Sequence, residues 1–384
     1  MDSYDEASSQ RALEQLNVLD TLPDERVDRV TRLAQELFQV PMVSVTLLDK
    51  DRQWRMSEIG LGGREAGREH AFCDVTVRQP NTLIVEDASQ DEHFHDNPFV
   101  TGDPHLRFYA GHPLRAPGGE PIGTLCIMDS ATRSLDTRQQ ALLQDLAQWV
   151  QTEIARRAEL DDLELIQRAQ CPRKLPRIPG YTVASGAKPA RAISGDFHDL
   201  QLTADGLRMT VADVMGKGLG PGIVAAGLRS TLRALGQRPP VEAMTEADRL
   251  LAEDLGDIDI FVTAFHGDLN TSTGTLRFVD AGHNLGVLFR ASGNQHRART
   301  SGLPLGMGLA SEHEEAVVHM EPGDTFVCSS DGLLDLLDLD DPTGDVERIF
   351  RDVEPADAVE TVLDLARAAK DADDVTVVII RRDA

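Results

Sequence analysis

The chain has few aromatic residues and a deficit of positive charge. Phe, Trp and Tyr make up 4% of its 384 residues, and 38 Lys and Arg stand against 64 Asp and Glu, giving a formal net charge of −26. A field of this sign repels phosphate backbones and anionic lipid, and scarce aromatic rings leave few platforms for stacking bases. The composition therefore argues against nucleic acid and membrane surfaces as partners, whereas divalent cations are compatible with it.

Long apolar runs and paired cysteines are lacking as well. No apolar run approaches the 18 residues of a membrane-spanning helix, and the N-terminal residues show no signal-peptide pattern. The cysteines are widely spaced, without a C-x-x-C pair, as is typical of reduced thiols: Cys73, Cys126, Cys171 and Cys328. We expect a cytoplasmic protein without a disulfide framework.

One stretch without Gly or Pro divides the chain. Residues 137–170 contain neither, and their apolar residues recur at helical spacing: Leu143, Leu146, Val150, Ile154 and then Leu160, Leu163 and Ile166. This predicts one helix, or two nearly continuous ones, on the order of 50 Å long at 1.5 Å per residue. A proline-punctuated segment follows. We therefore expect two domains, residues 1–155 and 176–384, joined by a helical linker over residues 156–175.

Both domains are expected to be α+β. In the first, strand-like runs at 42–48, 82–85, 108–114 and 122–128 and a helix over 25–38 indicate a small antiparallel sheet with helices. In the second, the same reasoning gives strands at 207–214, 261–269, 275–281, 286–290, 324–329 and 375–381 and helices at 222–235, 245–255 and 356–369. Short hairpins with inserted helices favour stacked antiparallel sheets covered by helices.

Acidic residues beside turns or at strand ends recur in the second domain. They lie in four segments: SGD ending at Asp196, ADVMGKG with Asp213, SDG with Asp331, and the pair Asp373 and Asp374. Carboxylates at the ends of neighbouring strands can converge on one rim of a sheet, and hard divalent cations prefer such oxygen ligands. The neighbouring glycines allow close backbone approach and positive φ. Each Asp-Gly pair alone is an ordinary turn, so the ordered set of four carries the metal hypothesis.

The motifs of the second domain resemble those of a known family. The order SGDFHD, ADVMGKG, DAGHNLG, SGLPLGM, SSDGLLD and DADDVTVV is similar to that of the PPM metal-dependent protein phosphatases, and more narrowly to their bacterial SpoIIE-like branch. The resemblance spans about residues 166–381. It implies a β-sandwich flanked by helices, two Mn²⁺ or Mg²⁺ ions, and removal of phosphate from Ser or Thr of an anti-sigma-factor antagonist.

The resemblance also implies roles for individual residues. Asp213 matches the acid that bridges two ions, and the carbonyl of Val214 a backbone ligand. Asp331 and Asp373 match ligands of one ion, and Asp196 an acid that reaches the other.

Four further residues have weaker roles by the same resemblance. Asp199 and Asp374 lie within the same motifs, as metal ligands or as support. Lys217 and His198 are candidate substrate contacts, although a solvated loop lysine and a packing substitution explain them as well.

Residues 10–155 resemble a GAF sensory domain. The similar segments include PMVSVTLLDKDRQWRMSEIG, RFYAGHPL and IGTLCIMD. GAF pockets bind cyclic nucleotides, bilins, haem or nothing detectable, so the ligand is left open, and Cys73 is either a chromophore anchor or a buried structural thiol.

The two resemblances together predict a serine/threonine phosphatase controlled by its GAF domain. The apolar stripe of the linker helix further predicts a homodimer joined through that helix. Two alternatives stay open at this stage: a catalytically degenerate signalling scaffold, and a metal-dependent phosphodiesterase, whose usual histidine-rich ligands are missing here.

Overall fold

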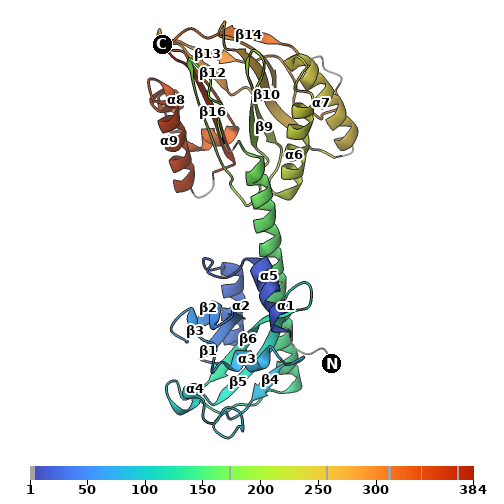
Figure 1. The fold of residues 1–384 in the computed structure, drawn as a ribbon, viewed down its shortest axis with the longest axis vertical. Coiled ribbons are helices and arrows are strands. Elements are labelled where there is room, and N and C mark those ends of the chain that lie inside the picture. The colour runs from blue at the N-terminus through green and yellow to red at the C-terminus, as the bar shows by residue number, and fades with distance from the viewer. Residues whose placement is uncertain (1–4, 173, 257, 310–312, 339, 370–371) are drawn as a thin grey trace. The chain divides into compact units, whose positions relative to one another are not determined.

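The chain forms two compact units, residues 1–161 and 162–384. The computed structural model describes residues 5–172, 174–256, 258–309, 313–338, 340–369 and 372–384. The division lies within α5 (Thr137–Gln170), a single helix that contributes to both units (Figure 1). Of the two forms that the sequence allowed, the structure shows the one continuous helix. None of the described helices is apolar enough over a sufficient length to cross a membrane.

The first unit is built on a six-stranded antiparallel sheet in the order β3-β2-β1-β6-β5-β4. Its strands are β1 (Met42–Leu48), β2 (Arg52–Ile59), β3 (Glu65–Gly67), β4 (Leu83–Val85), β5 (Phe108–Arg115) and β6 (Pro121–Asp129). Its helices, besides the start of α5, are α1 (Glu6–Leu16), α2 (Glu25–Phe38), α3 (Phe72–Thr76) and α4 (Pro98–Thr101).

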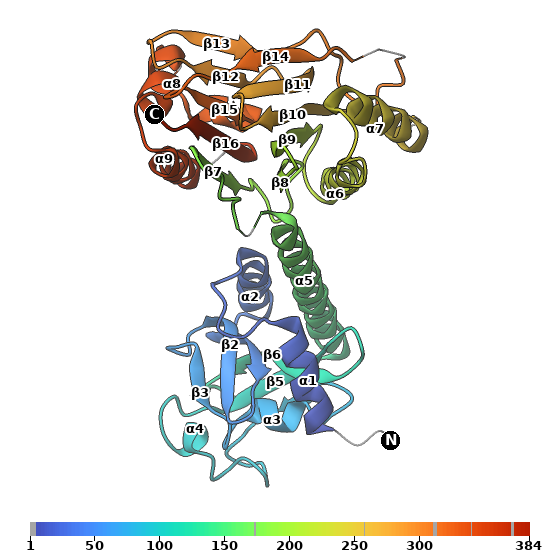
Figure 2. The same ribbon diagram turned by 45° about the horizontal axis from the view of Figure 1, so that its top comes forward.

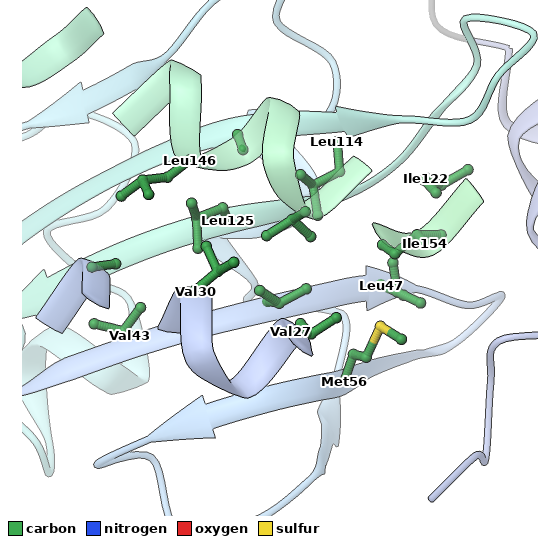
Figure 3. Packing of buried hydrophobic residues seen from close by; sticks show 14 of the residues in the cluster. Val27, Val30, Val43, Leu47, Met56, Leu114, Ile122, Leu125, Leu146 and Ile154 are labelled. Carbon is green, nitrogen blue, oxygen red and sulfur yellow. The ribbon is translucent and has the colours of Figure 1, made fainter. Parts of the chain in front are cut away.

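Helices α2 and α5 cover one face of this sheet. Asp24 caps α2 by accepting a hydrogen bond from the backbone of Arg26, and the helix then buries one apolar face. Figure 3 shows Val27 and Val30 of α2 among side chains from the strands and from α5. The stripe of α5 from Leu143 to Ile154 is buried in this core. Helix α5 exposes Trp149 (42%) in its first part, and Leu165 (67%) and Ile166 (57%) in its later part.

The second unit contains two five-stranded antiparallel sheets. One has the order β14-β11-β10-β9-β8 and the other β13-β12-β15-β16-β7. Their strands are β7 (Tyr181–Lys188), β8 (Phe197–Leu202), β9 (Gly206–Val214), β10 (Val262–Asn270), β11 (Thr275–Ala281), β12 (Gly286–Phe289), β13 (Gln295–Ala298), β14 (Ala316–His319), β15 (Thr325–Ser329) and β16 (Val375–Arg382).

Helices cover the outer faces of the two sheets (Figure 2). They are α6 (Leu219–Ala234), α7 (Pro240–Leu255), α8 (Pro342–Phe350) and α9 (Pro355–Ala368), with a short 3₁₀ helix, η1 (Asp331–Leu336). Helices α6 and α7 pack on the sheet of β8–β11, and α9 packs on β7 and β16. Between the sheets, the rings of Phe265, Phe278 and Phe326 meet in a buried core. The predicted sandwich flanked by helices is confirmed.

Candidate active site

Four predicted acidic segments meet at one edge of the second unit. Asp196 immediately precedes β8, and Asp213 lies near the end of β9, which pairs with β8 so that Phe197 is opposite Ala212. In the other sheet, Asp331 follows β15 and Asp373 precedes β16, and these strands also pair. Backbone hydrogen bonds hold each pair of segments at this edge: Val214 N to Gly195 O (3.3 Å) and Ser330 N to Thr376 O (2.9 Å).

The acids of this edge repel one another. Burial, and then the charges of Asp331 and Asp373, raise the pKa of Asp213 from 3.8 to about 6. Burial and the charge of Asp373 also raise the pKa of Asp331. The pKa of Asp196 is raised well above its ordinary value by burial and by Asp213. We call Asp196, Asp213, Asp331 and Asp373 the acidic edge. A set of carboxylates that lacks enough positive partners is suited to cations.

The donor set fits a hard divalent cation. All four side chains offer oxygen, and Oδ2 of Asp196 is buried without a hydrogen-bond partner. Among the described residues, however, no group of three His, Cys, Asp or Glu side chains is arranged to hold an ion in this conformation. One physical reason is that Asp373 already has a cationic partner, since Lys217 Nζ lies 2.9 Å from its Oδ2. Lys217, expected as a substrate contact, is therefore paired with a predicted metal ligand.

Asp374 supports the edge through its hydrogen bonds. Its two carboxylate oxygens accept hydrogen bonds from the backbone of Ala190 (2.7 Å) and Gly195 (2.9 Å), and its carbonyl accepts one from Ser330 Oγ (3.1 Å). These contacts tie three segments of the acidic edge together. Of the two roles considered for Asp374, metal ligand and support, these hydrogen bonds agree with support.

Glycines permit the close packing of these segments. A Cβ atom on Gly332 would lie 2.1 Å from the carbonyl oxygen of Asp374, so no larger residue fits without a shift of the backbone. Gly216, in the loop after β9, has a φ of +101°. Both uses of glycine that the sequence suggested, close approach and positive φ, are present.

Asp199 lies apart from the acidic edge in its contacts. Its carboxylate accepts hydrogen bonds from Arg233 Nε (2.8 Å), Arg229 Nη2 (3.2 Å) and Gln201 Nε2 (2.6 Å). Two arginines from α6 thus neutralise it. The suggestion that Asp199 is a metal ligand finds no support in these contacts, whereas a supporting role agrees with them.

His198 is buried beside β7. The ring is 4% exposed, its Nε2 lies 3.0 Å from Ser185 Oγ, and burial lowers its pKa to about 4. At neutral pH the ring is therefore uncharged and cannot serve as an imidazolium acid toward a leaving group. The packing interpretation agrees with this environment.

The end of α5 contacts the segment that carries Asp196. Gln167 accepts a hydrogen bond from Ser194 N (2.9 Å) and donates one to Ser194 O (2.6 Å), while Ser194 Oγ accepts one from Asp196 N (3.0 Å). A cavity of about 300 Å³ lies beside this contact and is lined in part by Gln167, Asp196 and Arg229. Sequence reasoning did not identify Gln167, because a polar residue on a solvated helix carries no distinctive pattern.

Comparisons with known families agree with this architecture. Residues 22–154 match the model of the GAF domain, and residues 203–383 match that of Stage II sporulation protein E (SpoIIE). The solved SiaA-PP2C domain of Pseudomonas aeruginosa aligns with a TM-score of 0.50 at 22% identity, covering 61% of this chain and 99% of that one. That likeness shows the fold.

Two curated relatives share parts of the sequence. Cyclic di-GMP phosphodiesterase PA2567 of Pseudomonas aeruginosa is 37% identical over 151 residues, which are 39% of this chain and 26% of that protein. Phosphoserine phosphatase RsbU of Bacillus subtilis is 23% identical over 187 residues, 48% of this chain and 55% of that protein. The chain thus spans about a quarter of the first relative and just over half of the second.

Proposed function

The chain carries a GAF domain followed by a domain of the SpoIIE family, and we propose that it is a metal-dependent phosphatase of phosphoserine or phosphothreonine in a partner protein. The observation that carries this proposal is the acidic edge, where carboxylates from four segments lie together and where burial and neighbouring acids raise the pKa of Asp196, Asp213 and Asp331. A scaffold would gain nothing from such mutual repulsion, which a bound cation relieves.

The acidic edge would hold two Mn²⁺ or Mg²⁺ ions. The ligands would be Asp196, Asp213, the carbonyl of Val214, Asp331 and Asp373. When bound, such a pair of ions lowers the pKa of a shared water and neutralises charge on the phosphoryl oxygens. The chain's own contribution is to place these oxygens. Asp374 fixes the segment before Asp196, and Gly332 lets the segment of Asp331 pack closely against the backbone of Asp374. Asp373 would exchange Lys217 for an ion.

The substrate is proposed to be a phosphorylated anti-sigma-factor antagonist. Support comes from the six motifs of the second domain, from its SpoIIE family match, and from the similarity to Phosphoserine phosphatase RsbU. A cyclic dinucleotide is the competing substrate, suggested by the similarity to Cyclic di-GMP phosphodiesterase PA2567. Because the match covers 26% of that relative, it gives no support for the same activity here.

We further propose that the GAF domain controls the phosphatase through α5 in a cytoplasmic homodimer. The same helix buries its first part in the GAF core and hydrogen-bonds Ser194 through Gln167 at its other end. Since Leu143, Leu146, Val150 and Ile154 are buried within one chain, the homodimer would use the exposed Leu165 and Ile166 instead. A monomer by light scattering at high protein concentration would contradict it.

A phosphate-release assay tests the proposed activity. The full chain is incubated with Mn²⁺ and a phosphorylated antagonist protein. It is incubated separately with a cyclic dinucleotide, whose hydrolysis to the linear dinucleotide is followed by chromatography because that reaction frees no phosphate. We expect hydrolysis of the phosphorylated antagonist and not of the cyclic dinucleotide. In Asp213→Asn the rate of phosphate release should fall about 100-fold or more, because one charged ligand is removed. The matched control is Asp205→Asn. Asp205 is an exposed acid that immediately precedes β9, at the end of the strand away from Asp213, and this variant should keep full activity. Equal turnover by Asp213→Asn would exclude the assignment.

A further inference from the structure

The first unit contains a cavity that the proposed reaction does not use. It has a volume of about 200 Å³ and is lined by residues of β1, β2, α3, β5 and β6. Two cysteines share its wall, Cys73 on α3 and Cys126 on β6, and their sulfur atoms are 3.9 Å apart. Both thiols are shielded from bulk solvent, at 5% and 1% exposed. Helix and sheet therefore present a thiol pair to a small internal space.

The two thiols have unequal surroundings. Hydrogen bonding with Cys126 lowers the pKa of Cys73 to about 7, whereas the same contact and burial raise the pKa of Cys126 well above its ordinary value. Tyr109 Oη also lies 3.8 Å from Cys73 Sγ. Of the two thiols, Cys73 is therefore the one that loses its proton more readily, and the thiolate is the form that reacts with oxidants.

We propose that Cys73 and Cys126 form a reversible disulfide, and that hydrogen peroxide is the oxidant. A disulfide requires a sulfur–sulfur distance of about 2 Å, so the two atoms must approach each other by roughly 2 Å from their present 3.9 Å separation. The cavity is lined by both cysteines and has a volume large enough for hydrogen peroxide.

The chemistry balances without any other reactant. The Cys73 thiolate attacks one peroxide oxygen and breaks the O–O bond, giving a sulfenic acid and hydroxide. The proton of Cys126 converts that hydroxide to water. The Cys126 thiolate then attacks the sulfenic sulfur and displaces a second hydroxide, which takes the proton that Cys73 had earlier released. Two thiols lose two electrons in total, and hydrogen peroxide is reduced to two molecules of water.

The other cysteines lack this arrangement. Cys328 is buried in the second unit, where burial raises its pKa well above the ordinary value, and Cys171 is half-buried at the end of α5 with a pKa raised by burial. Neither has a thiol partner within hydrogen-bond distance in the described part of the chain. Oxidation should therefore select the pair in the first unit.

Intact-mass analysis and peptide mapping test the proposal. The reduced full chain is treated with hydrogen peroxide near equimolar amounts, then alkylated and digested. We expect two of the four thiols to be protected, a cross-linked peptide containing Cys73 and Cys126, and full reversal by dithiothreitol. Four alkylated thiols, or cross-links through Cys171 instead, would overturn the proposal.

Conservative variants keep the test independent of folding defects. Cys126→Ser should accumulate a Cys73 sulfenic acid that dimedone traps, because the resolving thiol is gone, whereas Cys328→Ser should form the disulfide as the unaltered chain does. Absence of dimedone labelling in Cys126→Ser, with circular dichroism unchanged, would contradict the assignment of Cys73 as the attacking thiol.

Discussion

Two buried aspartates, one immediately before β8 and one within it, are in opposite situations. Asp196 is 7% exposed, has an oxygen without a partner, and faces other carboxylates, whereas Asp199 is 2% exposed and bonded to Arg229 and Arg233. The two differ in neutralisation and not in burial. A buried carboxylate with arginine partners supports the fold, and one among like charges is a candidate for ion binding.

The largest predicted effect concerns the neutralised region. Asp199→Ala leaves two arginines of α6 without their shared anion, and breaking such a buried pair costs about 3 kcal/mol. We expect urea denaturation to show this loss in the free energy of unfolding of the second unit. Asp364→Asn removes an exposed partner of Arg367 and should change that energy by less than about 0.5 kcal/mol. Equal effects of the two changes would remove the distinction.

Gly332→Ala should damage the acidic edge without changing its charge. The added methyl group would meet the carbonyl oxygen of Asp374 and push two ligand segments apart. A displacement of about 1 Å at reacting groups costs about 100-fold in rate, so phosphate release should fall by that order. Gly227→Ala in α6 has no atom within 4 Å of the new Cβ and should leave activity intact. Full activity in Gly332→Ala would argue against close packing as a requirement.

Removal of one repelling charge should stabilise the ion-free protein. The pKa of Asp213 is about 6 in the folded state and 3.8 in the unfolded chain, so the folded state keeps the proton to a higher pH. Stability in chelator therefore falls as the pH rises from about 4 to about 6. Asp213→Asn should reduce this fall and raise the melting temperature at pH 7. Thermal unfolding in chelator measures both, and a less stable variant at pH 7 would contradict the repulsion inferred here.

Lys217→Met should have the smallest effect. Lys217 and an ion compete for Asp373, and a half-exposed ion pair of this kind contributes up to about 1 kcal/mol, so Mn²⁺ affinity should rise by up to about 5-fold. Lys50→Met, which breaks an exposed pair with Glu14 in the first unit, controls for the change in net charge. Calorimetric titration compares them, and weaker Mn²⁺ binding by Lys217→Met would reverse the interpretation.

Much of the fold could be predicted from apolar periodicity. Helix α2, helix α5 and strand β1 have the bounds that their patterns indicated. Strand β2 was missed because its sequence, RQWRMSEI, carries charged residues on a buried sheet, and β8 was missed because FHDLQL buries His198 and Asp199. In both strands long-range pairing decided the structure over local pattern.

The acidic residues of the candidate site could be found by their positions at strand ends. The contacts that distinguish a candidate metal ligand from a supporting residue could not be predicted in this way. The hydrogen-bond donors to the Asp374 carboxylate, for example, lie about 180 residues away in the sequence. The same holds for Gln167, whose hydrogen bonds to Ser194 follow from the packing of α5 on the second unit.

Mn²⁺ titration of the full chain by calorimetry tests the central claim most directly. We predict binding of two ions per chain, loss of binding at one or both sites in Asp213→Asn, and unchanged binding in Asp205→Asn. Undetectable Mn²⁺ binding by the unaltered chain, or the same binding by Asp213→Asn, would contradict the assignment of the acidic edge as a metal centre.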